Sequence, residues 1–419
     1  MRIVHLCKND LQGGAARAAY RLHKGLQQSG CDSSMFVVSK TSDDASVSAF
    51  SKPMNLANVV QRGLRQICLA RRFDKYSKSR PAGLELFSDD RCTFGRSILG
   101  QMCGFDVINL HWVPGFVDYK SFFRGIPGSA VVVWTLHDMN PFTGGCHYNL
   151  GCARYLQGCG KCPQLGSSQE GDLSSDIWHR KRNVFASIPT PSLRIVAPSK
   201  WLASEAKASP ILHKFPVSVI PNGLDLEEFA PRNRASVREL LGVPQDARVL
   251  LFVAEDVGNQ RKGFALLVEA VARCARNIPN LLVMSLGQNR PSVPAGVDCR
   301  HIGPVNNDQF LSMVYSAADL FAICSLQDNL PNTVLEAMAC GIPIVGYAVG
   351  GIPDMVRNEV NGLTVTPGDA QALADAICTV LGNKDRCTEM GVNARRIAIQ
   401  DYSVEQQARR YGELYSTPV

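Results

Sequence analysis

The chain has 419 residues, which is enough for two domains of ordinary size, each with its own hydrophobic core. Its composition, 45% hydrophobic and 19% charged, is typical of globular proteins, and the net charge of +7 comes without the basic and aromatic pattern of nucleic-acid-binding proteins. No run of about 18 or more apolar residues occurs, and the first residues have the pattern of a strand. We therefore expect no membrane span and no signal peptide, a cytoplasmic location, and no nucleic acid as a partner.

The chain begins with a strand, RIVHLC, followed by a loop and an amphipathic helix within residues 8–30. Gly13 and Gly14 stand at the turn between them. Because glycine has no side chain, backbone N–H groups at such a turn can approach a bound diphosphate. A tight turn without a ligand fits the same residues, since a Gly-Gly pair is a much weaker signal than a full glycine fingerprint.

The basic segment, residues 61–80, contains seven basic residues against one acid, with Leu64, Ile67, Leu69 and Phe73 interleaved. This composition predicts a helix that lies on the anionic headgroups of the inner membrane leaflet. The alternative is a solvated basic helix face, because charge runs in globular proteins usually have that role.

Two nearly continuous apolar strands follow, FDVINLHWV and SAVVVWTLHD, as expected for a parallel sheet that is covered on both faces. They carry His111 and His137 near their ends. Open α/β sheets bind ligands at the carboxyl edge of their strands. We therefore predict functional roles for these two histidines, with satisfied core histidines as the alternative.

A glycine-rich insertion over residues 140–165 contains four cysteines with intervals of five, six and two residues: Cys146, Cys152, Cys159 and Cys162. Four thiolates in such a loop suit a closed tetrahedral zinc site, which would give the insertion a local core. Free buried thiols and disulfide chemistry are the alternatives. The remaining cysteines are mostly single residues in apolar segments, where a thiol behaves as a small hydrophobe, so a disulfide framework is not expected.

The polar, proline-bearing stretch after VIPNG is interpreted as a linker, because the alternation of strands and helices starts again beyond it. We predict a first domain over residues 1–225, a second over 226–398 and a C-terminal helix over 399–419. Arg261 and Lys262 stand at the expected start of the first helix of the second domain. Fixed cations at a helix N-terminus favour a bound anion, with a solvated basic pair as the alternative.

Asp328 and Glu336 stand eight positions apart in the stretch CSLQDNLPNTVLEAMACGIPIVGYAVGG. The pattern predicts a helix capped by Asn332 and ended by Gly341, with the first acid in the preceding loop and the second in the helix. The helix N-terminus suits a phosphate, whereas the carboxylates suit hydroxyl groups of a ribose and a sugar. The stretch therefore predicts a site for a sugar nucleotide, and a buried helix with an acidic first turn is the alternative.

This pattern of an acid, seven residues and a glutamate running into LEAMACGIPIV resembles the signature of the retaining glycosyltransferases of family 4, in particular bacterial polysaccharide-assembly members. The resemblance implies the GT-B fold, an α/β fold of two Rossmann-like doubly wound domains that face each other across a cleft. The usual family motif has a Glu followed by x-Phe-Gly, whereas Asp328 is followed here by NLPN. Ala254 and Glu255 also replace the usual Gly-Arg, although the Lys-Gly pair at Lys262 is kept.

The resemblance implies a hexosyltransferase of cell-surface polysaccharide or exopolysaccharide biosynthesis, which transfers a sugar with retention from a nucleotide-diphosphate sugar to a glycan or lipid-linked acceptor. It implies no metal or other cofactor for catalysis, since no Asp-x-Asp motif is evident, and leaves zinc only a structural role. The implied residues are His137, Arg261, Lys262 and Asp328 for catalysis, Gly13, Gly14, Asn329, Leu330, Pro331, Asn332 and Glu336 for the donor, and His111 for the acceptor side. The rival interpretations are a catalytically weakened sugar-nucleotide-binding partner subunit and a GT-B epimerase.

Overall fold

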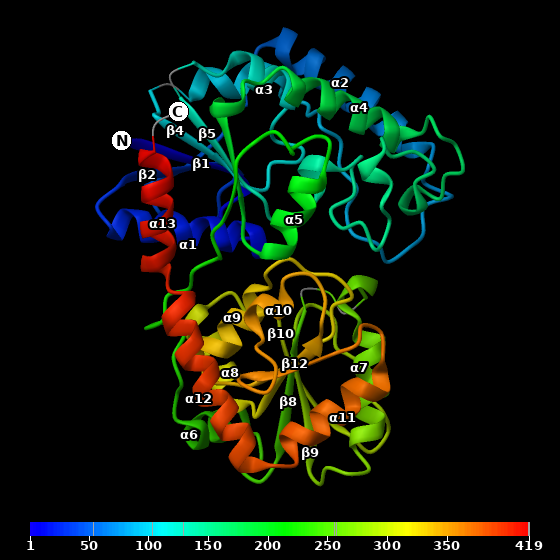
Figure 1. Cartoon of the computed structure of the whole chain (residues 1–419), viewed down its shortest axis with the longest axis vertical. Helices are drawn as coiled ribbons and strands as arrows, with labels where there is room; N and C mark the ends of the chain where they lie inside the picture. The colour runs from blue at the N-terminus through cyan, green and yellow to red at the C-terminus, as the bar shows by residue number, and fades with distance from the viewer. Residues whose placement is uncertain (53, 103, 129, 255, 257, 418–419) are drawn as a thin grey trace. The chain divides into compact units, whose positions relative to one another are not determined.

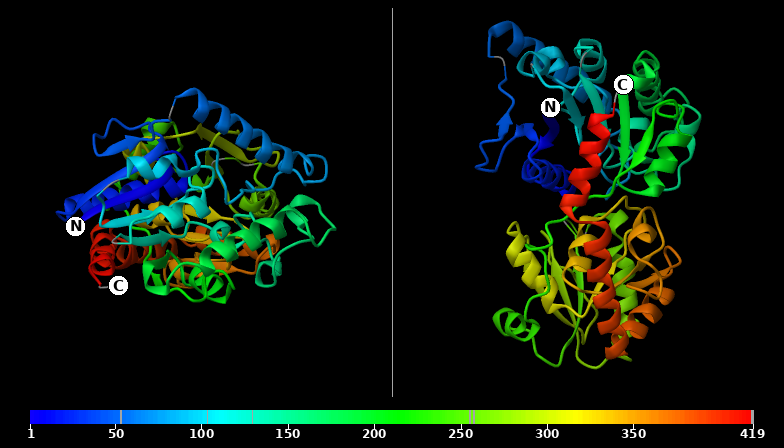
Figure 2. Two further views of the ribbon diagram at one scale, coloured as in Figure 1. Left: turned by 90° about the horizontal axis from the view of Figure 1, so that it is seen from above. Right: turned by 60° about the vertical axis from the view of Figure 1, so that its left-hand side comes forward.

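The computed structural model describes residues 1–52, 54–102, 104–128, 130–254, 256 and 258–417. The chain divides into two compact units (Figures 1 and 2). The first unit comprises Met1–Pro221 together with the C-terminal residues from Gln407, and the second comprises Asn222–Gln406.

The first unit is built on a seven-stranded parallel sheet of order β3-β2-β1-β4-β5-β6-β7. Its strands are β1 (Arg2–Asn9), β2 (Asp32–Ser39), β3 (Val47–Ala49), β4 (Val107–Leu110), β5 (Val131–Thr135), β6 (Leu193–Ala197) and β7 (Val217–Val219). Its helices are α1 (Gly14–Gln28), α2 (Leu56–Asp74), α3 (Tyr119–Gly125), α4 (Leu173–Ala186) and α5 (Lys200–Ala208).

The first sheet is buried on both faces, as its continuous apolar strands predict. Alternate residues along β1 enter different cores: Val4 and Leu6 join a large aromatic-rich cluster, whereas Ile3 packs with residues of α1 and of the last helix, α13 (Val404–Ser416). Two tyrosines of α13 also form polar contacts with this sheet. Tyr415 accepts a hydrogen bond from the Asn109 side chain at 2.8 Å, and the Tyr411 hydroxyl lies 2.9 Å from that of Thr135.

The second unit contains a six-stranded parallel sheet of order β10-β9-β8-β11-β12-β13. Its strands are β8 (Arg248–Val253), β9 (Leu281–Leu286), β10 (Asp298–Gly303), β11 (Leu320–Ile323), β12 (Ile344–Tyr347) and β13 (Gly362–Val365). Its helices are α6 (Arg234–Leu241), α7 (Phe264–Cys274), α8 (Asp308–Ala317), α9 (Asn332–Ala339), α10 (Ile352–Met355), α11 (Ala370–Leu381) and α12 (Lys384–Asp401), and it includes the start of α13.

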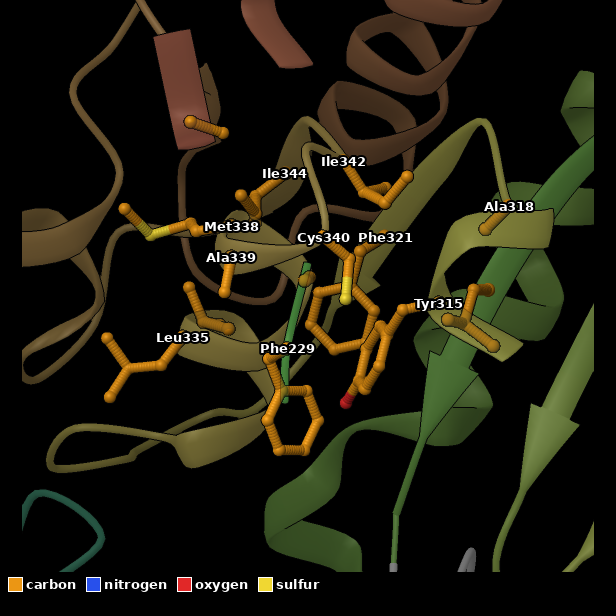
Figure 3. Close-up of a cluster of buried hydrophobic side chains, with 14 of the residues drawn as sticks. Phe229, Tyr315, Ala318, Phe321, Leu335, Met338, Ala339, Cys340, Ile342 and Ile344 are labelled. Atoms are coloured by element: carbon orange, nitrogen blue, oxygen red, sulfur yellow. The ribbon is translucent and has the colours of Figure 1, made fainter. Parts of the chain in front are cut away.

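The two faces of the second sheet are likewise covered by separate hydrophobic clusters. Figure 3 shows part of one, in which the apolar side chains of α9 pack near the rings of Phe229, Tyr315 and Phe321. The Tyr315 and Phe321 rings meet edge to face, with centroids 6.0 Å apart. This packing fixes α8 and α9 against the sheet, and both helices carry residues of the site described below.

Most predicted elements are present. Side chains cap two of the helices: at α5, Ser199 accepts a hydrogen bond from the Leu202 N–H, and at α11, Asp369 accepts one from the Ala372 N–H. The predicted linker is wrong, because the stretch after Pro221 contains α6 and packs into the core of the second unit. Val237 lies in that core, and Arg238 donates to the carbonyl oxygen of Ala317 and pairs with Asp319. The observed divisions, after Pro221 and after Gln406, lie near the expected ones at 225 and 398.

No helix in the described part of the chain is long and apolar enough to cross a bilayer.

Candidate functional site

A polar cluster in the second unit lies where the strand order reverses, because β8 pairs with β9 on one side and with β11 on the other. The loop after β8 reaches the loop after β11 through the pair of Lys262 and Asp328. The loop after β12 reaches the same place, since the Gly351 N–H donates to the Asp328 carbonyl oxygen at 3.1 Å. Open α/β sheets bind ligands at the carboxyl edge of such a reversal.

The carboxylate of Asp328 is at the centre of this cluster. Lys262 Nζ donates to Oδ2 at 2.8 Å, and the Arg261 guanidinium lies 3.2 Å from the same oxygen. The Ser325 hydroxyl donates to Oδ2 at 3.0 Å, and the Asn329 N–H donates to Oδ1 at 3.1 Å. Two cations therefore share one buried carboxylate.

Asp328 is ionised in this setting. Burial alone would raise the pKa of its carboxyl group, but the charges of Lys262 and Arg261 outweigh burial and hold the pKa far below its ordinary value.

Two glycines allow the loops of this cluster to approach closely. Gly263 has φ +67°, and a Cβ atom there would lie 2.0 Å from the Cys324 carbonyl oxygen. Gly350 has φ +54°, and its Cβ would lie 1.8 Å from the Asp328 carbonyl oxygen. Because any larger residue would meet backbone atoms at both positions, the loops after β8 and β12 can pack on the loop after β11 only with glycine there.

Glu336, the second predicted acid, is buried on α9 and accepts a hydrogen bond from the Tyr315 hydroxyl at 3.0 Å. The predicted cap at Asn332 is wrong by one residue: Pro331 occupies the N-cap position, and Asn332 is already helical. A residue with helical backbone inside the first turn cannot cap that turn. The Asn332 side chain instead accepts a hydrogen bond from Asn222 at 3.2 Å.

The other predicted donor residues have different surroundings. Asn329 is buried beside Asp328, whereas Leu330 belongs to the hydrophobic core of the unit. Arg261 is only 8% exposed, and its guanidinium also donates to the Gln327 carbonyl oxygen at 2.8 Å. Arg261 therefore stabilises the loop after β11 from a buried position and does not project into solvent. Glu255 lies outside the described residues.

In the first unit, the predicted histidines lie together at the reversal between β1 and β4. His111 follows β4 and His137 follows β5, with 3.0 Å between Nδ1 of His111 and Nε2 of His137. His5 of β1 adds a third ring, because its Nδ1 lies 2.9 Å from His111 Nε2. His5 was not predicted, since it lies inside an apolar strand and its pairing depends on the register of β1 with β4.

Gly13 has φ +90° and ψ 158°, a backbone region open essentially only to glycine. It precedes α1, whose first residue is Gly14, and among the described residues, its chain neighbours apart, no atom lies within 4 Å of where a Cβ of Gly13 would stand. The turn therefore needs a glycine for its backbone and not for packing. The predicted contact of Gly13 and Gly14 with a diphosphate stays a prediction.

The sequence interpretation also missed a buried network beside His137. Asp138 accepts hydrogen bonds from His147 Nδ1 at 2.6 Å and from Trp112 Nε1 at 3.0 Å, and His147 Nε2 lies 2.8 Å from the Ser88 hydroxyl. The Ser88 N–H donates to the Gly145 carbonyl oxygen at 2.8 Å. This network holds the loop after β5 in place. In the sequence, only the LHD triplet around His137 indicated it.

Two family models match this chain, one in each half. The family model described as Glycosyltransferase Family 4 matches residues 12–228, which is more than half of the chain. The chain belongs to glycosyltransferase family 4. A second model, Glycosyl transferases group 1, matches residues 247–383, which include both the Asp328 cluster and Glu336.

The curated relatives of this family 4 chain include D-inositol 3-phosphate glycosyltransferases. The protein of Saccharomonospora viridis is 36% identical over 181 residues, or 39% of this chain and 42% of the relative. The protein of Corynebacterium urealyticum is 31% identical over 222 residues, or 48% of this chain and 51% of the relative. The chain thus spans about half the length of the curated relatives that it matches.

Solved structures of low identity share the whole fold. HepE of Anabaena, crystallised with UDP and glucose, has a TM-score of 0.64 at 17% identity, with 99% of each chain covered. Sucrose-phosphate synthase of Thermosynechococcus elongatus has a TM-score of 0.67 at 20% identity, with 99% of this chain and 98% of that chain covered. WaaG, a glycosyltransferase involved in lipopolysaccharide biosynthesis, has a TM-score of 0.65 at 16% identity, with 99% and 100% covered. These likenesses identify the family 4 chain as a GT-B protein with two doubly wound domains.

The four cysteines of the insertion line a common small cavity of about 20 Å³ in this family 4 chain. In the described part of the chain, however, no three His, Cys, Asp or Glu side chains are grouped closely enough to hold a metal ion as they stand. Burial raises the pKa of the Cys146 thiol to about 12, so without a metal this thiol is neutral. The insertion also has aromatic contacts of its own, since Phe142 and Tyr155 pack with Trp178 in the main core.

Zinc binding by these cysteines therefore stays a prediction. If it is correct, elemental analysis of the purified chain will find about one zinc per molecule. Cys159→Ser is then expected to lose the metal and to increase proteolysis within residues 140–165, whereas Cys274→Ser, at a buried cysteine of α7, keeps the metal. Metal-free protein whose insertion resists protease equally in both variants would show that the thiols are simply buried.

Proposed function

We propose that the chain is a retaining glycosyltransferase that transfers a hexosyl group from a nucleotide-diphosphate sugar to a glycan or lipid-linked saccharide. The observation that carries this proposal is the Asp328 cluster, in which Lys262 and Arg261 share one buried carboxylate at the strand reversal. Two adjacent cations suit a diphosphate, and the ionised carboxylate suits a neighbouring hydroxyl group.

The proposed chemistry depends on electrostatics and positioning. As the bond between sugar and diphosphate breaks, negative charge grows on the leaving oxygen, and a fixed ammonium at Lys262 stabilises that charge. Arg261 holds the loop and contributes charge from its buried position. In a retaining transfer, a donor phosphate oxygen takes the acceptor proton on the same face of the sugar, so the protein supplies alignment rather than a general base. Glu336 holds the ribose hydroxyls in this proposal.

The donor class has support from the fold neighbours. HepE of Anabaena was crystallised both with UDP and glucose and with UDP-glucose, at 17% identity to this chain. Asp328 stands where the family motif has a glutamate, so a shorter carboxylate side chain contacts the sugar in this proposal. We therefore propose a uridine or similar nucleotide donor whose sugar differs from that of standard family members.

Helix α2, which contains most of the basic segment, supports the proposed acceptor class. Four apolar residues at intervals of four, four and three lie on one side of α2 and are strongly exposed: Leu56 (79%), Val60 (52%), Leu64 (64%) and Ile67 (51%). Arg71, Lys75 and Lys78 are exposed near the end of the helix. This exposed apolar face with adjacent cations suits an anionic membrane surface and hence a lipid-linked acceptor.

Part of the basic segment contacts the protein itself. Arg72 pairs with Asp176 of α4, and Phe73 packs against the cluster that contains Phe87. These residues therefore face the protein, so the apolar stripe, rather than the full set of cations, is available to lipid. We propose a peripheral location on the inner leaflet and a role in cell-surface polysaccharide assembly.

Introducing charge into this apolar stripe, formed by Leu56, Val60, Leu64 and Ile67, is expected to weaken vesicle binding. Leu64→Asp combined with Ile67→Asp should lower partition onto anionic phospholipid vesicles by about tenfold or more, because each side chain loses apolar contact worth on the order of 1 kcal/mol or more. Leu240→Asp, at a residue of α6 that is 66% exposed, is the matched control and should bind as the unchanged chain does. Sedimentation with vesicles of stated composition measures the binding of each variant. Equal binding by the unchanged chain, the double variant and Leu240→Asp would contradict the membrane proposal.

A second acceptor class follows from the curated relatives, whose name specifies D-inositol 3-phosphate. That acceptor is a small phosphorylated polyol and needs no membrane. Assays of the chain with lipid-linked saccharides and with polyol phosphates, given the same donor, separate the two classes by which product forms.

Release of free nucleoside diphosphate from a panel of sugar nucleotides tests the function itself. A transferase releases the nucleotide when its acceptor is present and forms a product that keeps the anomeric configuration of the donor, which NMR of the product reports. A partner subunit without catalysis would shift its melting temperature with a donor but release nothing. An epimerase would instead return a stereoisomer of the sugar.

A further inference from the structure

A larger cavity lies in the second unit, at the edge of its sheet that is opposite the Asp328 cluster. Its volume is about 290 Å³, close to the lower end of the range for small-molecule sites. Asp319 directly precedes β11 and Pro343 directly precedes β12, and both line the cavity. Because these strands are parallel, the cavity lies at their amino ends, whereas the Asp328 cluster follows the carboxyl end of β11. The cavity is therefore separate from the proposed donor site.

The walls of this cavity come from two segments that pack closely. One is the turn after α9, with Cys340 and Gly341, and the other is the first half of α12, with Cys387, Thr388 and Gly391. A Cβ atom at Gly391 would lie 2.3 Å from the Gly341 carbonyl oxygen. Backbone of α12 therefore lies directly on the turn, and this contact fixes the shape of the cavity.

Cations outnumber carboxylates in the cavity wall. Arg232, Arg234 and Arg395 line it, whereas Asp319 is the single acid among the described lining residues. Arg234 Nη1 lies 2.7 Å from one oxygen of Asp319, and Arg238, outside the lining, lies 2.8 Å from the other. Asp319 is thus already shared by two guanidinium groups.

The other two arginines bind neutral acceptors. Arg395 donates to three backbone carbonyl oxygens at 2.7, 2.8 and 2.9 Å. Arg232 donates to two others, at 3.3 and 2.8 Å. In the part of the chain that the structure describes, neither guanidinium forms an ion pair with a carboxylate. Carbonyl groups orient these side chains without cancelling their charge.

The charges of both arginines act on the wall of the cavity. Burial raises the pKa of the Cys340 thiol to about 12. The Glu336 carboxylate acts in the same direction, whereas the charges of Arg395 and Arg232 act in the opposite one. Burial also lowers the pKa of Arg395 itself. An anion in the cavity would offset the desolvation of this guanidinium.

We propose that this cavity is a binding site for a small phosphate-bearing anion, held by Arg232 and Arg395. Guanidinium groups present N–H donors in a planar fork that matches the oxygens of a phosphate. The volume suits inorganic phosphate or a small phosphate monoester rather than a whole sugar nucleotide. The site is additional to the proposed transferase function and does not depend on it.

Protection of Cys387 from alkylation tests occupancy of the cavity in the full chain. The chain is treated with iodoacetamide in the presence of inorganic phosphate or of glucose 6-phosphate, and peptide mass spectrometry follows each cysteine. We expect glucose 6-phosphate to slow alkylation of Cys387 and to leave Cys68, an exposed cysteine, unchanged. Protection by inorganic phosphate as well would identify free phosphate as sufficient. Glucose, which lacks the phosphate, should give no protection.

Variants of the wall should raise the concentration of glucose 6-phosphate that half-protects Cys387. Arg232→Gln removes a charged donor and is expected to raise it by about tenfold or more, as loss of a hydrogen bond between charged groups implies. Arg396→Gln, at an exposed neighbour of Arg395 outside the lining, is the matched control and should leave it unchanged.

A second variant keeps both arginines. Thr388→Glu places a negative charge in the cavity wall and should also weaken protection of Cys387, because like charges repel. Its matched control is Thr379→Glu on α11. Both threonines are exposed, and the hydroxyl of each donates to the carbonyl oxygen four residues earlier.

Two results would overturn the proposal. One is that neither phosphate protects Cys387, or that glucose protects it equally well. The other is half-protection at the same concentration in the unchanged chain, Arg232→Gln and Thr388→Glu. If Arg232→Gln fails to fold, Thr388→Glu still decides the question. No sugar transfer is measured, so failure of this proposal and failure of the proposed function are distinguishable.

Discussion

Lys262→Ala is expected to raise the activation barrier for sugar transfer by about 2–4 kcal/mol while changing donor affinity much less. The ammonium is held 2.8 Å from Asp328 before any ligand binds, so it needs little reorganisation when charge grows on the leaving diphosphate. Steady-state kinetics with a competent donor measure turnover, and calorimetry measures affinity.

Two controls sharpen this experiment. Lys262→Arg keeps the charge but changes its geometry and should recover part of the rate. Lys384→Ala removes an exposed cation at the start of α12 and should leave both quantities unchanged. Full turnover in Lys262→Ala would show that other groups stabilise the charge that develops on the diphosphate.

Asp328→Asn is expected to lower the free energy of unfolding by about 3–5 kcal/mol, because it leaves two largely buried cations without their carboxylate. The side chains of Asp328 and Arg261 are both 8% exposed, and that of Lys262 is 23% exposed, so solvent screens this loss only weakly. Urea unfolding at neutral pH measures the difference. Asp385→Asn, at an exposed residue of α12, is the matched control and should change stability little.

The same ion cluster predicts the direction of a pH effect. Because folding lowers the pKa of Asp328, its stabilising contribution is complete above the pKa of the unfolded chain, about 4, and is lost as the pH falls through the lower folded value. The difference in stability between the unchanged chain and Asp328→Asn should therefore shrink as the pH falls below about 4. If the difference in stability stayed constant over that range, loss of the Asp328 carboxylate would not be the cause of the lower stability of the variant.

The sequence predicted the two parallel sheets and the site stretch because both are local patterns. Continuous apolar strands, glycine at turns and the spacing of Asp328 and Glu336 are visible without knowing which distant segments meet. Helix caps such as Ser199 and Asp369 are equally local, because their partners lie three residues away.

Contacts between distant segments could not be predicted in this way. Asp328 meets Lys262 across 66 positions, and His5 meets His111 across 106, so neither pairing leaves a signal in spacing. The contact of Arg72 could not be predicted for a similar reason, since its partner Asp176 lies on α4. The prediction therefore named most members of each cluster without the partners that organise them.

The path of the backbone has a practical consequence for recombination. The second unit is one uninterrupted segment, and its ends are tied together, because the Leu224 N–H donates to the Tyr402 carbonyl oxygen and the Val404 N–H donates to the Leu224 carbonyl oxygen. In topology it is a cassette inserted between the seventh strand of the first unit and that unit's last helical segment. Exchange of this cassette between relatives would require only two junctions, at neighbouring points of the backbone, and would leave the hydrophobic cores of the host unit intact.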